Sequence, residues 1–265
     1  MTTTIGGPEP GSAAPPDAGA PAERPGGGRA DRARRQARRQ LVWLVPLAMV
    51  CVAFLAFTLP PYATFDPEQA RFPIREDFPP HYPLMVAHIM AGAVMLLITC
   101  AQVSPWVRRH HPAVHRWSGR VYVFAGVPLM GLPGLVIAPL SHTGFSTQVS
   151  NTLWALLWLG TTVAGYRMAR ARRYADHREW MLRSFALLWA IVLNRPWAFV
   201  CVMVLMPQLE TTFGGQEALM IQQAASASSW LSWVTVLIVV ELWIQRSRGR
   251  RGPARRAAAN ATAAG

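Results

Sequence analysis

Four histidines and one arginine lie within or beside long apolar segments of this sequence, where polar side chains are uncommon. They are His88, His115, His142, His177 and Arg195. Polar groups at membrane depth are usually functional, because burying them in hydrocarbon is costly. Neutral imidazoles that face one another across a helix bundle are also a common way to hold haem iron. These five residues therefore form the candidate site.

Two of the histidines begin the same local pattern, H-x-x-x-G-x-V. His88 is followed by Gly92, and His115 is followed by Gly119. A spacing of four residues places the histidine and the glycine on one helix face, with Tyr122 continuing the second of these faces. A small residue beside an imidazole lets a neighbouring helix or a flat ligand approach closely. Both cofactor binding and ordinary small-residue helix packing account for the pattern.

The depth of each histidine limits which of them can share a ligand. His88 differs in height from the end of the helix that carries His115 by roughly 20–25 Å, so those two residues cannot share one metal. His115 and His177 both lie at one membrane boundary, and this pair can ligate one haem b. His88 and His142 form a looser pair, because His142 follows the end of its helix. Interfacial anchoring beside Arg and Trp remains the alternative for His115 and His177.

Arg195 lies in the middle of an apolar segment, between Asn194 and Pro196. An arginine at a helix centre costs at least about 2.5 kcal/mol on insertion scales. The following proline kinks the helix and frees a carbonyl group. A guanidinium in this place favours an anion such as a haem propionate, a lipid headgroup or a substrate carboxylate. A water-filled cavity remains the alternative.

Apolar runs predict the helices that position these residues. A bilayer-spanning helix needs about 20 apolar residues. We predict six such helices, at about residues 41–60, 82–103, 117–140, 152–168, 181–206 and 229–245, within one domain over 41–246. The first is expected to be uncleaved, since its apolar run is longer than that of a secretory signal. Residues 1–40 and 247–265 are predicted to be disordered, basic tails.

Arginines in the loops predict the orientation. They cluster in the N-terminal tail, the second and fourth loops and the C-terminal tail, whereas the third and fifth loops contain none. This alternation is what the positive-inside rule expects for an even number of spans with both termini in the cytoplasm. The sequence thus predicts an all-α integral membrane protein, with helices two to five as a central four-helix core.

Composition excludes several other classes of protein. The formal net charge of +13 comes entirely from arginine, because the chain has no lysine. Those arginines lie in tails and short loops and not on a folded module, which argues against a nucleic-acid partner. The three cysteines (Cys51, Cys100 and Cys201) each lie in an apolar run without a CxxC motif, so neither a disulfide framework nor a zinc site is expected. No nucleophile elbow or P-loop is present, which argues against a hydrolase or an ATP-driven pump.

The histidine-containing strings together resemble a known family. The pattern from His88 to Gly92, the string HRWSGRVY from His115, the string HREWMLRS from His177, and Arg195 follow one another in order. Over about residues 85–197 this arrangement is similar to the bacterial membrane family called domain of unknown function 2306. The resemblance implies an uncharacterised multi-pass protein of the bacterial plasma membrane and assigns no activity. A weaker resemblance to di-haem cytochrome b-561 proteins implies b-type haem, because the four histidines alternate between the two faces.

Three functions remain open at this point. The leading hypothesis is a membrane oxidoreductase or electron-transfer component with a redox partner or quinone. It places haem b on His115 and His177, a second haem on His88 with or without His142, and propionates on Arg195. The alternatives are an anion- or lipid-binding, transporter-like protein with a cavity lined by His88, Asn194, Arg195 and Tyr122, or a non-catalytic membrane scaffold. Membrane lipid is a partner in all three.

Overall fold

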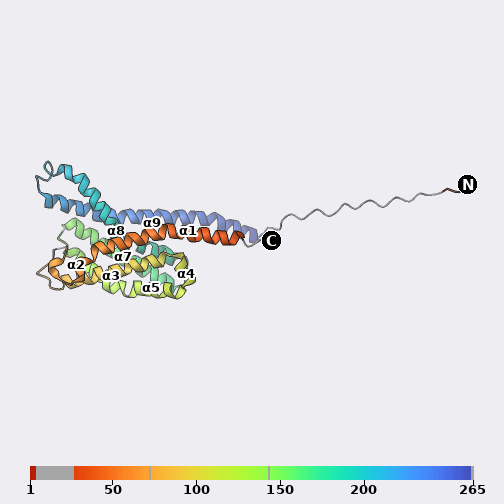
Figure 1. The fold of residues 1–265 in the computed structure, drawn as a ribbon, viewed down its shortest axis with the longest axis horizontal. Coiled ribbons are helices and arrows are strands. Elements are labelled where there is room, and N and C mark those ends of the chain that lie inside the picture. Colours follow the sequence, from red (N-terminus) through yellow and green to blue (C-terminus); the bar gives the residue numbers. More distant parts are fainter. Residues whose placement is uncertain (4–26, 72, 143, 264–265) are drawn as a thin grey trace. The chain divides into compact units, whose positions relative to one another are not determined.

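A computed structural model of the chain is built from helices (Figure 1). It describes the backbone of residues 1–3, 27–71, 73–142 and 144–263, and side chains within 1–3, 42–71, 73–142 and 144–249. Those residues contain no β-strand, as the all-α prediction requires. The chain divides into two units, Met1–Arg39 and Gln40–Gly265. In the first unit only residues 1–3 and the first part of helix α1 (Gly27–Thr58) are described, so the predicted disorder of residues 4–26 lies outside the described part.

The second unit continues α1 and contains all of the other elements. They are α2 (Pro60–Ala63), η1 (Pro67–Gln69), α3 (His81–Val103), α4 (Pro105–His110), α5 (Pro112–Phe124), η2 (Val127–Gly131), α6 (Leu132–Ile137), η3 (Ala138–Leu140), α7 (Phe145–Arg170), α8 (Tyr174–Leu205), η4 (Met206–Gln208) and α9 (Glu217–Ala263). Proline begins α2, η1, α4 and α5. Its fixed φ and missing N–H are tolerated in the first turn of a helix, where the backbone donor has no partner within the helix.

Within the described part of the chain, four helical stretches are long and apolar enough to cross a membrane. They are His81–Val103, Pro112–Leu140, Tyr174–Gln208 and Glu217–Gly249. The apolar stretch Val42–Thr58 is shorter. Helix α7, with 26 residues, reaches about 39 Å but is not among the four. Ser, Thr, Gln and Asn are frequent in its first turns and lower its hydropathy. The described residues thus contain four of the six predicted spans by length and composition.

Several helices extend beyond their predicted ends. Helix α8 begins at Tyr174 where residue 181 was expected, and α9 begins at Glu217 where residue 229 was expected. The backbone of α9 also remains helical to Ala263, where we predicted a disordered tail. An apolar run predicts only the part of a helix that can lie in the hydrocarbon layer. Polar turns at either end of that part are also helical, so the observed helices are longer than predicted. Alanine and arginine, frequent in the last part of α9, are among the best helix formers.

The predicted third helix is not a uniform α-helix. It consists of α5, η2, α6 and η3, and η2 is a π-helix over Val127–Gly131. Pro128 and Pro133 lack the N–H that would continue the α-helical ladder, which leaves carbonyl groups free. Short π-helical segments often occur at functional sites. Here the widened turn makes the carbonyl oxygen of Met130 available to a side chain from α3.

Helices of the second unit pack in a series in which α3 contacts α5, α5 contacts α7, α7 contacts α8, and α8 contacts α9. Figure 1 shows α3, α5 and α7 running side by side. Their shared core contains several large residues, namely Met95, Leu96, Tyr122, Trp158, Leu187, Trp189 and Trp233. Cys51 and Leu55 of α1 belong to the same core.

Large apolar side chains also cover the outside of the helices. Phe124, Val163, Phe199 and Val239 are exposed on α5, α7, α8 and α9. Soluble monomers rarely expose large contiguous apolar surfaces of this kind. An outward apolar surface on several long helices is what a surrounding lipid phase requires.

Candidate functional site

The helices of the second unit have two ends, which we call the Arg-rich face and the opposite face. The Arg-rich face is formed by α4 and by the turn between α7 and α8, with Arg108, Arg109, Arg167, Arg170 and Arg173. The opposite face is formed by α2, η1 and the first turn of α3. His115 and His177 lie at the Arg-rich face, whereas His142 and Arg195 lie toward the opposite face.

His177 is held in one orientation by the backbone of α7. Its Nδ1 atom lies 2.8 Å from the carbonyl oxygen of Gly165. Because that oxygen only accepts, Nδ1 carries the hydrogen, and Nε2 of the neutral ring keeps its lone pair. Gly165 permits the close approach, since a Cβ there would lie 2.6 Å from the sulfur atom of Met181. A histidine fixed through Nδ1 in this manner is a typical metal ligand.

His115 lies in the first turns of α5, and its backbone is anchored to α3. Gln102 Nε2 donates to the carbonyl oxygen of His115 and to Ser118 Oγ, both at 2.7 Å. Gly119, one turn along, leaves room for the amide of Gln102, which would lie 3.4 Å from a Cβ there. The His115 Nδ1 atom is buried and has no hydrogen-bond partner among the described residues. A buried polar atom in this state costs about 1–3 kcal/mol unless a ligand satisfies it.

Two arginines lie near the imidazole of His115. Arg108 and Arg116 act on it electrostatically, and the imidazole of His177 is also within electrostatic range. No carboxylate in the described part of the chain forms an ion pair with Arg108 or Arg116. These two arginines, without a carboxylate partner among the described residues, favour an anionic ligand beside His115.

His88 is held at a different place, by the π-helix. Its Nδ1 atom lies 2.7 Å from the carbonyl oxygen of Met130, so Nε2 again keeps its lone pair. A Cβ on Gly134 would lie 2.8 Å from the imidazole ring, which shows that the ring packs directly on the backbone of α6. A Cβ added at Gly92, in the same pattern as His88, would lie 3.6 Å from the sulfur of Met130, which is an ordinary van der Waals contact. Gly92 therefore faces Met130, and the space beside it would accept a methyl group.

His142 is exposed in the segment after η3, and the structure does not place it with His88. Its electrostatic neighbours are His81 and Asp77. His81 Nδ1 accepts a hydrogen bond of 3.0 Å from the backbone N–H of Arg75. The Arg75 guanidinium, 3.0 Å from the Asp77 carboxylate, lowers the pKa of that carboxyl group. His142 thus belongs to a loop cluster with His81 and Asp77.

Tyr122 belongs to a polar cluster that is fully satisfied within the protein. It is only 1% exposed, and its hydroxyl lies 2.8 Å from Ser184 Oγ. Trp158 Nε1 donates to the same hydroxyl at 2.9 Å, and Thr162 Oγ1 lies 2.7 Å from Ser184 Oγ. Tyr122 therefore joins α5, α7 and α8 and has no free group for a ligand.

Sequence reasoning did not identify the partners of Tyr122, nor a second cluster of the same kind. In that cluster Trp233 Nε1 donates to Ser150 Oγ at 2.9 Å, and Ser150 Oγ lies 2.9 Å from Ser229 Oγ. Asn151 accepts from Ser229 at 2.8 Å. The available signal was the frequency of Trp, Ser and Thr inside apolar runs, which side-chain hydrogen bonds between membrane helices explain.

Arg195 lies past the middle of the candidate span Tyr174–Gln208, on the side of the opposite face. Helix α8 starts earlier than predicted, so Arg195 is about 32 Å along its axis from Tyr174. The guanidinium lies 5.9 Å from the ring centroid of Phe54, and its charged or titratable neighbours are Arg71 and Tyr62. Neighbouring Asn194 has its own partner, with its Nδ2 atom 3.3 Å from Ser228 Oγ.

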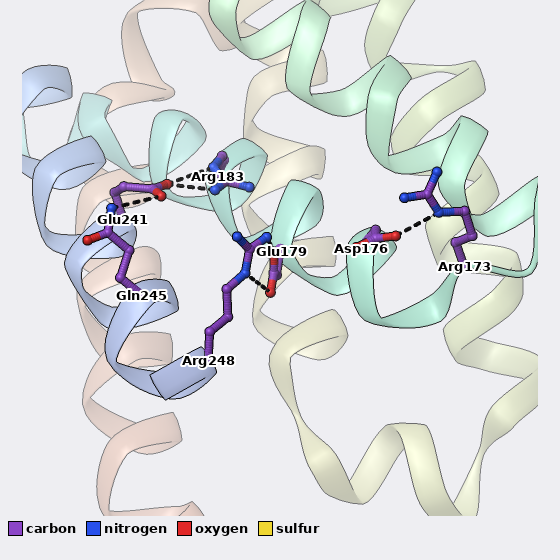
Figure 2. A network of polar contacts seen from close by, with 7 residues as sticks. All are labelled: Arg173, Asp176, Glu179, Arg183, Glu241, Gln245 and Arg248. Carbon is purple, nitrogen blue, oxygen red and sulfur yellow. Dashed lines mark hydrogen bonds and ion pairs between the residues drawn. The ribbon is translucent and has the colours of Figure 1, made fainter. Parts of the chain in front are cut away.

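Ion pairs join α8 and α9 at the Arg-rich face. Figure 2 shows Arg183 of α8 paired with Glu241 of α9, with 2.6 Å between Nη2 and Oε2. Arg248 of α9 reaches back to Glu179 of α8. These pairs hold the part of α9 around Glu241 and Arg248 beside the first turns of α8. They thus support the backbone that carries His177.

Comparison with known proteins identifies the family. The chain matches the family described as predicted membrane protein (DUF2306) over residues 85–244, more than half of its length. The chain belongs to this family. The DUF2306 match continues into α9, whereas the resemblance in the sequence motifs ended near residue 197. No curated protein and no solved structure matches the chain.

Proposed function

We propose that this DUF2306 protein binds one b-type haem at its Arg-rich face, where His115 and His177 would hold the iron. The observation that carries the proposal is the buried, unpartnered Nδ1 atom of His115 beside an imidazole fixed by Gly165. Within the described part of the chain no three metal-ligating side chains converge. Two histidines are nevertheless a sufficient protein ligand set for haem iron, because the porphyrin supplies the other ligands.

Charge around the pair supports a porphyrin with carboxylate substituents. Arg108 and Arg116 lie near His115 and have no carboxylate partner among the residues that the structure describes. A guanidinium pairs well with a propionate through charge-assisted hydrogen bonds. This assignment moves the propionate-binding role from Arg195, where the sequence suggested it, to the two arginines at the Arg-rich face.

The residues of the chain would orient and tune the bound haem. A haem held by two histidines supplies one-electron transfer. Gly165 O accepts from His177 Nδ1, which fixes the tautomer and makes Nε2 a better donor to iron. We propose a redox carrier, such as a quinone, as the partner in this reaction.

Orientation follows from the distribution of arginine. We propose that α1 and α7 complete a set of six spans, and that the Arg-rich face and both termini are cytoplasmic. In this arrangement the haem lies near the cytoplasmic boundary of a bacterial plasma membrane. Helices α3 to α8 would surround it, while α9 braces α8 through Arg183 and Glu241.

A second haem is not part of the proposal. The ring of His88 packs on Gly134, whereas His142 lies beside His81 and Asp77. A single cavity lined by His88, Asn194, Arg195 and Tyr122 is not favoured either. His88 and Asn194 each have a hydrogen-bond partner elsewhere, and Tyr122 is buried in its own cluster.

Haem content of the purified protein tests the proposal. Full-length protein is produced with added haem precursor, and haem per chain is measured by the pyridine haemochromogen assay. We expect about one haem in the wild type and in the control variants His110→Ala and His142→Ala, whose side chains are exposed. His115→Ala and His177→Ala should each lose most of it. Haem-free wild-type protein would contradict the proposal and leave a scaffold role.

A further inference from the structure

A second polar cluster lies at the opposite face, away from the histidine pair. It combines Arg71, which precedes α3, with Arg195 of α8, Tyr62 of α2 and Tyr82 of α3. Thr58, at the end of α1, is close by in the chain. These residues come from four different helices and one loop, so the fold and not local sequence brings them together.

Three hydroxyl groups in this region have no partner. Thr58 Oγ1, Tyr62 Oη and Tyr82 Oη are buried without a hydrogen bond to any described residue. Tyr62 is 1% exposed, and the backbone of Arg71 lies beside its phenol without forming a hydrogen bond of normal geometry. Burial raises the pKa of Tyr62, so its hydroxyl remains protonated and able to donate at neutral pH. The Tyr122 hydroxyl, in contrast, has hydrogen-bond partners within the protein. The three unpartnered hydroxyls can therefore donate to a bound ligand.

The two arginines in the cluster also lack a neutralising group. Arg71 and Arg195 are close enough for their charges to repel one another, and no carboxylate of the described residues pairs with either. Each rests on an aromatic ring: Arg71 lies 4.2 Å from the centroid of Phe57, and Arg195 lies 5.9 Å from that of Phe54. Two adjacent guanidinium groups with unbonded hydroxyl donors beside them form a receptor for an oxyanion.

We propose that this cluster binds the phosphate headgroup of an anionic membrane lipid. Phosphate offers enough acceptor oxygens for two guanidinium groups and the tyrosine hydroxyls. The site is open on the side of Phe57, which is 57% exposed on α1, and both arginines are exposed. An acyl chain can therefore lie along α1, over Phe57 and Phe54, while the headgroup contacts Arg71 and Arg195. The inference is independent of haem binding at the other face.

Lipid-dependent thermal stability of the full-length protein tests this inference. The protein is purified in a neutral detergent, and its unfolding midpoint is measured against phosphatidic acid, phosphatidylglycerol, phosphatidylcholine and inorganic phosphate. We expect saturable stabilisation by the two anionic lipids, and little by phosphatidylcholine or by inorganic phosphate. Arg71→Gln and Arg195→Gln should each weaken the apparent affinity for anionic lipid about tenfold or more, because each removes a charge-assisted contact.

Two further sets of variants separate binding from folding and from net charge. Tyr62→Phe and Tyr82→Phe should weaken lipid binding several-fold without lowering the unfolding midpoint of lipid-free protein, since neither hydroxyl has a partner in the protein. Arg75→Gln removes the same charge from the same loop, but Arg75 is paired with Asp77, so binding should not change.

Several outcomes would overturn the inference. Equal stabilisation by phosphatidylcholine would show that headgroup charge is not recognised. Equal effects of inorganic phosphate and lipid would assign the site to a soluble oxyanion and not to a lipid. Unchanged affinity in Arg71→Gln and Arg195→Gln would place the lipid elsewhere.

Discussion

The Nδ1 atom of His177 lies 2.8 Å from the carbonyl oxygen of Gly165, which ties the first turns of α8 to the last turns of α7. His88 makes the equivalent bond of 2.7 Å to Met130. In each case a histidine side chain bonds to a backbone carbonyl of a neighbouring helix. The acceptor is a glycine in α7 for His177, and it belongs to the π-helix for His88. Both bonds leave Nε2 with its lone pair, but only His177 has a second imidazole near it.

Gly134→Ala should destabilise the protein by displacing His88. A Cβ at this position would lie 2.8 Å from two ring atoms of His88, and that ring is held by Met130. Overpacking of this kind costs about 1–3 kcal/mol in the free energy of unfolding. Thermal unfolding of the purified variant in detergent measures the effect.

Gly160→Ala is the matched control for that substitution. Gly160 lies in α7 with no atom within 4 Å of its Cβ position, so the same change meets open space. Alanine is the better helix former by up to about 1 kcal/mol, so this variant should be as stable as the wild type or more so. Equal losses in the two variants would argue against the packing of His88 on α6.

Tyr122→Phe should destabilise the protein more than Tyr62→Phe does. Removing the Tyr122 hydroxyl leaves Trp158 Nε1 without its acceptor and Ser184 without one contact, at a cost of about 1–3 kcal/mol. Tyr62 is equally buried, but its hydroxyl bonds to no described residue. The two unfolding midpoints are compared under one set of detergent conditions without added lipid. A larger loss for Tyr62→Phe would contradict the assignment of its hydroxyl as unpartnered.

Glu241→Gln should weaken the contact between α8 and α9. Arg183 is 17% exposed, so removal of its carboxylate partner leaves a mostly buried charge, with an expected cost of about 1–3 kcal/mol. Asp176→Asn breaks the exposed pair with Arg173 and should cost less than about 1 kcal/mol. A double-mutant cycle with Arg183→Met isolates the coupling. A coupling energy near zero would show that the pair does not hold the helices together.

Labelling of single cysteines tests the proposed topology. In a background with the native cysteines replaced by serine, we expect Thr211→Cys, between α8 and α9, to react with a membrane-impermeant maleimide added outside whole cells. Arg173→Cys, in the turn between α7 and α8, should react only after the membrane is permeabilised. External labelling at both positions would contradict a membrane-spanning α8.

The sequence indicated the helices and the pairing of His115 with His177, because both depend on signals that repeat along the chain. Apolar runs define helices by length, and alternating arginines assign each loop to a face. Once the faces were assigned, His115 and His177 fell at one boundary, and His88 and His142 formed a looser pair at the other. In the structure the two imidazoles of His115 and His177 are within electrostatic range of one another.

Other features depend on contacts between segments far apart in the sequence, which no local pattern reveals. The contact of His88 with the carbonyl oxygen of Met130 joins α3 to the π-helix, and the partners of Tyr122 come from α7 and α8. The sequence placed Arg195 near the middle of a span, but it did not indicate which residues surround the guanidinium. Its neighbours Arg71 and Tyr62 are more than a hundred residues away along the chain.

The most direct test of the haem proposal is the reduced-minus-oxidised absorption spectrum of the purified protein. Wild-type protein should show the Soret and sharp α bands of a low-spin haem with two histidine ligands. These bands should be lost in His115→Ala and in His177→Ala, but unchanged in His142→Ala. A wild-type spectrum without a Soret band, or bands that persist when both His115 and His177 are replaced, would contradict the proposal.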